Sequence, residues 1–75
     1  MDEKIRILEC KLIGYKGNGS LIWYLELAGP SNVSKPTDYN GGYICALSVF
    51  LEDDTGDVYR FDETAATWRK WGGVI

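Results

Sequence analysis

The densest group of side chains that could do chemistry is the run EDDTGD. It places four carboxylates, Glu52, Asp53, Asp54 and Asp57, around one glycine. Oxygen ligands at such close spacing can hold calcium, but the run lacks the ligand spacing of an EF-hand loop. Aspartates in turns also accept backbone hydrogen bonds while they stay solvated. We favour this second interpretation, in which the acids build a turn, and we predict no metal and no other cofactor.

A second group is aromatic and offers a binding surface rather than a reaction. Its members are Tyr59, Phe61, Trp68 and Trp71. Exposed, these rings could stack on a sugar or form a protein hot spot. Buried, they would be cross-strand core pairs, which we favour for the first three. Trp71 is followed by a short segment that includes Val74 and Ile75, and such a chain end can dock on a neighbour.

The residues that most enzymes need are missing from this chain. It has no histidine, the commonest general base and metal ligand, and no histidine accompanies Cys10 and Cys45 to make an ordinary zinc site. No Gly-x-Ser-x-Gly elbow, P-loop or dinucleotide fingerprint is present. We therefore predict a protein that is not an enzyme. The two cysteines are expected to be buried, reduced thiols, with a disulfide between them as the alternative.

Length and composition predict one small folded domain, residues 1–75. The hydrophobic fraction of 45% and the charged fraction of 25% are those of a globular protein. The net charge of −3, with no basic stripe, argues against nucleic-acid binding. The start, MDEKIRILEC, carries charges where a signal peptide needs an apolar run, and no stretch reaches transmembrane length. We expect synthesis in the cytoplasm and no membrane contact.

The periodicity of the apolar residues is that of β-strands. Residues 21–28 alternate between an apolar and a mixed face. Residues 43–51 are apolar on both faces and predict a central strand. In residues 4–13 the apolar parity changes between Ile7 and Leu8, so a β-bulge there would turn both apolar sets towards the core. A helix over residues 4–13 is the alternative, but β-branched isoleucines and missing caps argue against it.

Connectors rich in glycine separate these strands. The run GYKGNGS predicts a hairpin over residues 14–20. The run DDTG predicts a type I turn with Gly56 in the left-handed region. DETAAT predicts a wider turn between a strand over residues 58–61 and a last strand that contains Trp68 and Trp71. These two tryptophans have opposite parity, so one of them, Trp71 in our interpretation, lies at an edge or an interface.

Together these segments predict an all-β fold, a small antiparallel barrel or sandwich of about five strands. Residues 29–42 hold both prolines and predict a long loop, of a kind that is often functional. We expect Lys35 and Tyr39 in this loop to contact a partner protein. The other predicted contact residues are Trp71, Val74 and Ile75.

The run DTGDVYRFDETAATWRKWG resembles a hairpin found in many phage tail-fibre, collar and head-decoration proteins. The matching residues are Thr55, Gly56, Asp57, Val58, Tyr59, Asp62, Thr67, Trp68 and Gly72. The run ILECKLIGYKGNGSLIWYLELAGPS also looks like short phage-encoded β proteins that end in this hairpin. The sequence departs from the commoner pattern at DETAAT, where a tighter Asp-Gly turn is usual. The resemblance implies a small homo-oligomeric virion component, made in the host cytoplasm, whose hairpin carries no catalytic residue.

Three functions are therefore hypotheses for this chain. The first is a phage structural protein, a capsid decoration or a tail or collar accessory, that acts by self-assembly and by contacts with other virion proteins. The second is a small phage inhibitor of a host defence protein. It would use the acidic face of residues 52–63 to mimic nucleic acid, with binding that weakens steeply with salt. The third is a carbohydrate-binding module.

Overall fold

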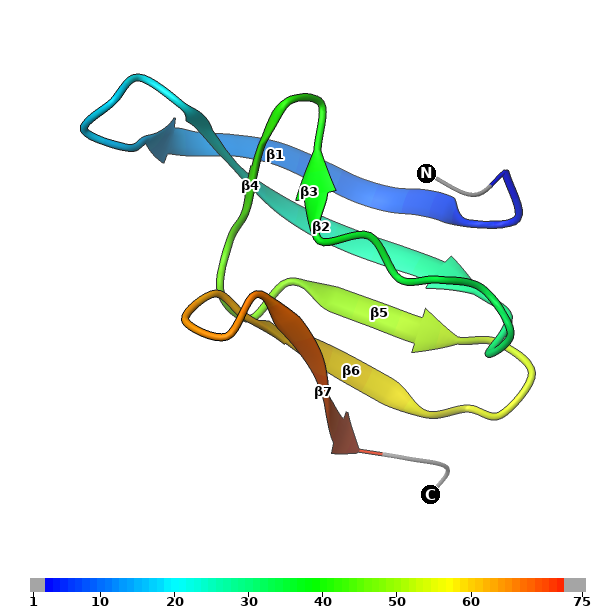
Figure 1. The fold of residues 1–75 in the computed structure, drawn as a ribbon. Helices are drawn as coiled ribbons and strands as arrows, with labels where there is room; N and C mark the ends of the chain where they lie inside the picture. Colours follow the sequence, from blue (N-terminus) through cyan, green and yellow to red (C-terminus); the bar gives the residue numbers. More distant parts are fainter. Residues whose placement is uncertain (1–2, 73–75) are drawn as a thin grey trace.

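One mixed β-sheet of seven strands makes up the fold (Figure 1). The computed structural model describes residues 3–72. The strands are β1 (Arg6–Tyr15), β2 (Leu21–Gly29), β3 (Asp38–Tyr39), β4 (Gly42–Ile44), β5 (Val49–Glu52), β6 (Val58–Asp62) and β7 (Thr67–Gly72). The all-β prediction is confirmed. The sheet is not closed into a barrel, however, and it has seven strands rather than about five. Within residues 3–72 no helix is long and apolar enough to cross a membrane.

Strand β2 is the centre of the sheet. It pairs antiparallel with β1 on one side. On its other side it pairs with β4 at its start and with β5 at its end, and both of these pairings are parallel. Strands β6 and β7 then continue the sheet antiparallel. The prediction of a purely antiparallel sheet is wrong because the segment between β2 and β4 is long enough to carry the chain back for parallel pairing. The predicted long loop over residues 29–42 is itself interrupted by β3 and ends in the first residue of β4.

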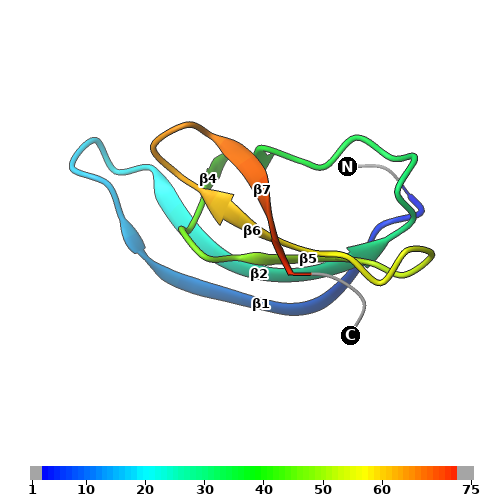
Figure 2. The same cartoon turned by 90° about the horizontal axis from the view of Figure 1, so that it is seen from below.

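The core lies on one face of this curled sheet. In the view of Figure 2, β7 and the segment after β2 stand on the same side of the layer formed by β1, β2 and β5. Leu25, Leu27 and Phe50 are fully buried on that side, and Val33 from the segment after β2 joins them. The predicted alternation in residues 21–28 is thereby confirmed, since the apolar face of β2 supplies the centre of the core.

The predicted central strand over residues 43–51 is wrong. The chain breaks into β4 and β5, with a turn between them at which Leu47 takes a φ of 66°. Hydrogen bonds to β2 bridge the break. The Cys45 N–H donates to the Trp23 carbonyl at 2.7 Å, and the Leu25 N–H donates to the Ser48 hydroxyl at 3.1 Å. A side-chain oxygen thus takes the place of a backbone carbonyl in the ladder.

Replacing Ser48 with alanine is expected to lower the free energy of unfolding by about 2 kcal/mol. Ser48 is fully buried, so the substitution leaves the Leu25 N–H unsatisfied inside the protein. Urea unfolding followed by circular dichroism measures the change. Ser34→Ala, at an exposed serine, is the control and is expected to stay within about 0.5 kcal/mol of the unsubstituted protein. Equal stability of the two variants would contradict the role given to the Ser48 hydroxyl.

The amino-terminal segment is a bulged edge strand. The predicted bulge is confirmed, because the pairing with β2 skips Leu8 between Ile7 and Glu9. A second bulge, at Ile13, was not predicted. The expectation that the bulge turns both apolar sets towards the core is wrong. Leu8 is 57% exposed and Ile13 53% exposed, because β1 has a neighbour on one side only within the described residues.

The predicted turns are confirmed. Gly19 closes the first hairpin with a φ of 86°, and Gly56 closes the β5–β6 hairpin with a φ of 79°. Both values lie in the left-handed region that glycine adopts without a steric penalty. The opposite parity of the last two tryptophans is also confirmed. Trp68 packs against the core, whereas Trp71 is 66% exposed on the edge strand β7.

Candidate protein-binding cleft at Trp71

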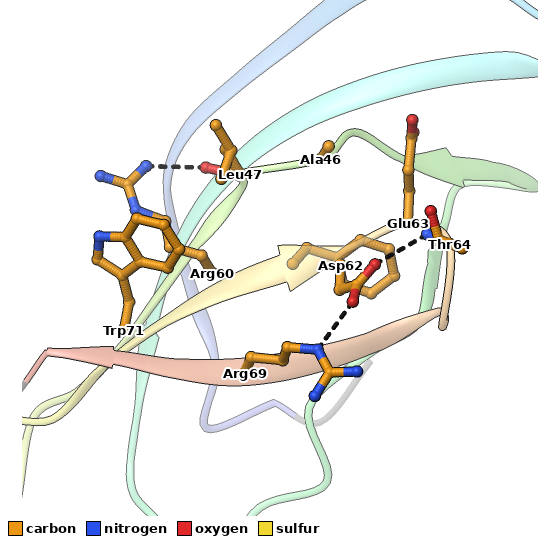
Figure 3. Close-up of a pocket in the computed structure, with 9 residues that line it drawn as sticks. Ala46, Leu47, Arg60, Asp62, Glu63, Thr64, Arg69 and Trp71 are labelled. Carbon is orange, nitrogen blue, oxygen red and sulfur yellow. Dashed lines mark hydrogen bonds and ion pairs between the residues drawn. The ribbon is translucent and has the colours of Figure 1, made fainter.

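A surface cleft of about 310 Å³ lies where the β4–β5 turn meets the β6–β7 hairpin (Figure 3). We refer to it as the Trp71 cleft. Its apolar lining includes Trp71 and Leu47, and its charged lining includes Arg60, Asp62 and Arg69. Tryptophan and arginine are the residue types that most often dominate binding energy at protein interfaces. The composition of the cleft therefore fits a protein partner better than a reacting small molecule.

The β6–β7 hairpin sets one wall of the cleft, and Asp62 holds its turn in place. One oxygen of the Asp62 carboxylate accepts hydrogen bonds from the Thr64 and Ala65 N–H groups, at 3.0 and 3.3 Å. The other accepts from Arg69 Nε at 2.8 Å. The Arg69 hydrogen bond, followed by the Ala65 N–H, lowers the pKa of Asp62 below its ordinary value. The carboxylate is therefore ionised at neutral pH and serves as a turn anchor.

The β4–β5 turn sets the opposite wall through a strained residue. Leu47 has a φ of 66°, a region that a bulky side chain rarely enters, and its side chain is nevertheless 52% exposed. Two contacts hold the strained backbone. The Leu47 N–H donates to the Phe61 carbonyl at 2.9 Å, and Arg60 donates to the Leu47 carbonyl at 2.9 Å. Strain of this kind costs on the order of 1–3 kcal/mol and is concentrated at functional sites.

Of the residues predicted to contact a partner, only Trp71 lies in the Trp71 cleft. Val74 and Ile75 lie outside the described residues. Lys35 is held inside the fold, with Nζ 2.6 Å from Glu52 Oε2 and 4.3 Å from the centre of the Tyr59 ring. Tyr39 packs edge-on against Trp23, with 5.4 Å between the ring centres. Partner contact by Lys35 and Tyr39 stays a prediction, and their side chains are occupied within the chain.

The cleft residues that were not predicted to contact a partner include Arg60 and Leu47. Arg60 interrupts the otherwise apolar run Val58–Phe61, and a charge in such a place is a signal that could have been followed. Leu47 gives no signal, because it lies within an apolar run that reads as a continuous strand. Its exposure follows from the break between β4 and β5, which depends on how β2 pairs.

The four carboxylates of the run EDDTGD, residues 52–57, each have a different partner. Glu52 pairs with Lys35, Asp53 with Arg6 at 3.0 Å, and Asp57 with Lys70 at 3.4 Å. Asp54 accepts hydrogen bonds from the backbone N–H and the hydroxyl of Ser31, at 3.0 and 2.7 Å. The Ser31 hydroxyl is the main reason that the pKa of Asp54 lies below its ordinary value. These carboxylates therefore act singly as structural groups in this fold.

The two cysteines are free thiols and half-buried. Burial, with a smaller effect of the Glu63 charge, raises the pKa of Cys45. A raised pKa keeps the thiol protonated at neutral pH and so keeps it a weak nucleophile.

Comparison of the chain with protein-family models, with curated proteins and with solved structures gave no match.

Proposed function

We propose that this chain is a non-enzymatic structural protein of a phage virion, a capsid decoration or a tail or collar accessory. It acts by self-assembly and by contacts with other virion proteins, after synthesis in the host cytoplasm. The observation that supports this proposal best is the exposed Trp71 in a cleft with an exposed, strained leucine. A large aromatic ring that is exposed to solvent on an edge strand contributes binding free energy when a partner buries it.

The fold supports an assembly function in a second way. The sheet is open, so its terminal strands, which include β1 and β7, present edges that another chain can use. A chain of 75 residues also has only a small core, and association adds the burial that one copy lacks. The resemblance of the carboxy-terminal hairpin to those of virion proteins supplies the cellular setting of the proposal.

Trp71→Ala is expected to weaken association while leaving the fold intact. Light scattering across a concentration range should show a lower average mass for the variant than for the unsubstituted protein. Urea unfolding should change by no more than about 0.5 kcal/mol, because an exposed side chain contributes little to the free chain. A mass unchanged by the substitution, or a large loss of stability, would refute the contact assigned to Trp71.

The inhibitor hypothesis is less well supported by the charge pattern. Of the six acids in residues 52–63, four form ion pairs with Lys35, Arg6, Lys70 and Arg69. A face that mimics nucleic acid needs unpaired negative charge, and these cations reduce it. Strong loss of partner binding with added salt would restore the hypothesis.

The carbohydrate hypothesis needs several exposed rings in one platform. Of the four aromatic residues that suggested it, Phe61 is 4% exposed, and Tyr59 and Trp68 pack against the core. Trp71 alone remains well exposed among them, which is too little for a stacking platform. A change in tryptophan fluorescence on adding glycans would be the result that favours this function.

A further inference from the structure

Strand β1 is a long, apolar and open edge of the sheet. It has ten residues, and within the described part of the chain it pairs only with β2. Among residues 3–72, five of the eight large apolar side chains that are exposed belong to it: Ile7, Leu8, Leu12, Ile13 and Tyr15. Figure 1 shows β1 and β7 at opposite ends of the sheet. A long apolar edge of this kind is a template for another strand.

The sequence of this edge is complementary to itself. Residues 7–13 read ILECKLI, so the apolar residues are the same in either direction around Cys10, while Glu9 and Lys11 exchange places. Antiparallel pairing of two copies centred on Cys10 gives the pairs Ile7 with Ile13, Leu8 with Leu12, and Glu9 with Lys11, each of them twice. Cross-strand pairs of opposite charge and of large apolar side chains stabilise a sheet.

We propose that β1 pairs antiparallel with β1 of a second copy of this chain, about a two-fold axis at Cys10. The pairing joins the two sheets into one continuous sheet across the dimer. Each copy presents the same strand to the other, as a two-fold interface requires. The strand that pairs with this edge is a second copy rather than an unrelated strand, because Glu9 of each copy then lies opposite Lys11 of the other.

The charges within one copy support this pairing. Glu9 lies directly opposite Glu26 of β2, and like charges in that position destabilise a sheet. Within the described residues neither Glu9 nor Lys11 forms an ion pair or a side-chain hydrogen bond. The pairing of β1 with β2 therefore gives Glu9 no partner of opposite charge. Lys11 of the second copy supplies the missing opposite charge.

The bulges of β1 confine the regular part of this pairing to its centre, because each Leu8–Leu12 and Ile7–Ile13 pair includes a bulged residue. They fall at Leu8 and Ile13, which leaves Glu9–Leu12 as a regular stretch in the pairing with β2. This stretch contains Cys10, the centre of the proposed pairing. Because bulges disrupt a ladder locally and increase its twist, regular pairing between the copies is strongest over the central residues and ends near the bulges.

This interface rests on the assembly function proposed above, but it lies at the other end of the sheet from Trp71. The experiment therefore uses the full chain with Trp71→Ala, so that contacts through the Trp71 cleft do not contribute. Glu9→Lys places two lysines opposite each other on either side of the central Cys10 pair, and Lys11→Glu places two glutamates there. Each substitution is expected to raise the dimer dissociation constant by roughly tenfold or more, measured by light scattering.

Mixing the variants provides the decisive measurement. In an equimolar mixture, the Glu9→Lys chain and the Lys11→Glu chain again place opposite charges across the interface, so a heterodimer is expected. The double variant Glu9→Lys/Lys11→Glu is expected to dimerise with itself, for the same reason. Asp38→Lys makes the same change of charge at an exposed position of β3, outside both β1 and the Trp71 cleft, and should leave the dimer unchanged. Restored dimers also show that the single variants are folded.

Amide hydrogen exchange locates the interface independently. Protection should rise with protein concentration in residues 7–13 of β1 and stay constant in β7. The proposal is overturned if the Trp71→Ala chain is monomeric at every concentration, if mixing does not restore dimers, or if the added protection lies outside β1. If the β1 dimer forms and Trp71→Ala does not change the association of the protein, the contact assigned to Trp71 is refuted and the β1 pairing is not. If no β1 dimer is found but the chain still associates through Trp71, the β1 pairing is refuted and the proposed assembly function is not.

Discussion

Lys35→Met is expected to lower the free energy of unfolding by about 3 kcal/mol. The substitution leaves Glu52, whose side chain is 5% exposed, without the cation that lies 2.6 Å from its carboxylate. Breaking a buried ion pair by removing one partner costs roughly 3–5 kcal/mol. We expect the lower end of this range because the Thr55 hydroxyl still donates to Glu52 Oε1 at 2.8 Å. Urea unfolding at neutral pH is the measurement.

At acid pH, the difference in free energy of unfolding between Lys35→Met and the unsubstituted protein should become smaller. The hydrogen bond from Lys35 lowers the pKa of Glu52 below its ordinary value of 4.5, although burial alone would raise it. The stability from this pair is therefore present above the unfolded pKa and is lost as the pH falls through the folded pKa. In the variant, burial raises the pKa of Glu52, so protonation relieves the buried charge. A constant difference from pH 7 to pH 3 would contradict this cause.

Two further variants separate the ion pair from the loss of a lysine. Lys16 also lies over a ring, 4.5 Å from the centre of Tyr43, but it forms no ion pair within the described residues. Lys16→Met should therefore cost no more than about 0.5 kcal/mol. Lys35→Met/Glu52→Gln removes both charges and should recover most of the lost stability. Equal losses in Lys16→Met and Lys35→Met would remove the special role of the buried pair.

Trp68→Ala is expected to lower the free energy of unfolding by about 3 kcal/mol, and Trp68→Phe is expected to lower it by about 1 kcal/mol. The Trp68 ring packs edge-on against Phe61 and Phe50, with 5.1 and 5.9 Å between ring centres, so alanine leaves a cavity between β5, β6 and β7. Its indole N–H also donates to the Pro36 carbonyl at 2.6 Å, which ties the segment after β2 to the last strand. Phenylalanine keeps most of the ring packing and loses this hydrogen bond.

The control for Trp68 lies on the same strand. Trp71→Ala removes an equal side chain from an exposed position and should leave stability nearly unchanged, as stated for the assembly test. Chemical unfolding followed by circular dichroism avoids the fluorescence of the tryptophans themselves. If Trp68→Phe were as costly as Trp68→Ala, the packing of the ring would not be the main contribution of this residue.

The local features of the fold could be predicted because residues close in sequence determine them. The turns at Gly19 and Gly56 need a left-handed backbone, and glycine at each position indicates that need. The bulge after Ile7 coincides with a change of parity in the sequence, although Leu8 and Leu12, which this change was expected to bury, are exposed. Trp71 is exposed, as its parity relative to Trp68 predicts, although it also lies at a bulge of β7 that the sequence does not indicate. In each case the reason lies within a few residues.

The features that were missed depend on distant pairing. Residues 43–51 have the apolar pattern of one strand, yet two separate parts of β2 take up β4 and β5, and the chain must turn between them. Nothing near Leu8 or Ile13 in sequence indicates that β1 lies at an edge, because the sequence does not state which neighbours a strand has. Lys35 was assigned to a partner for the same reason, since Glu52 lies 17 positions away.

The parallel pairing of β2 with β5 also determines how the chain must fold. Strands β1 and β2 are joined by a short hairpin, as are β5, β6 and β7, so each of these units can form from sequence neighbours within microseconds. The pairing of Leu27 with Phe50 instead requires closure of the whole segment between them. This closure costs chain entropy before the pairing contributes any stabilising contact. We therefore expect the joining of the two hairpin units to be the slow step of folding. Until it is complete, the apolar side chains of both units remain in contact with water.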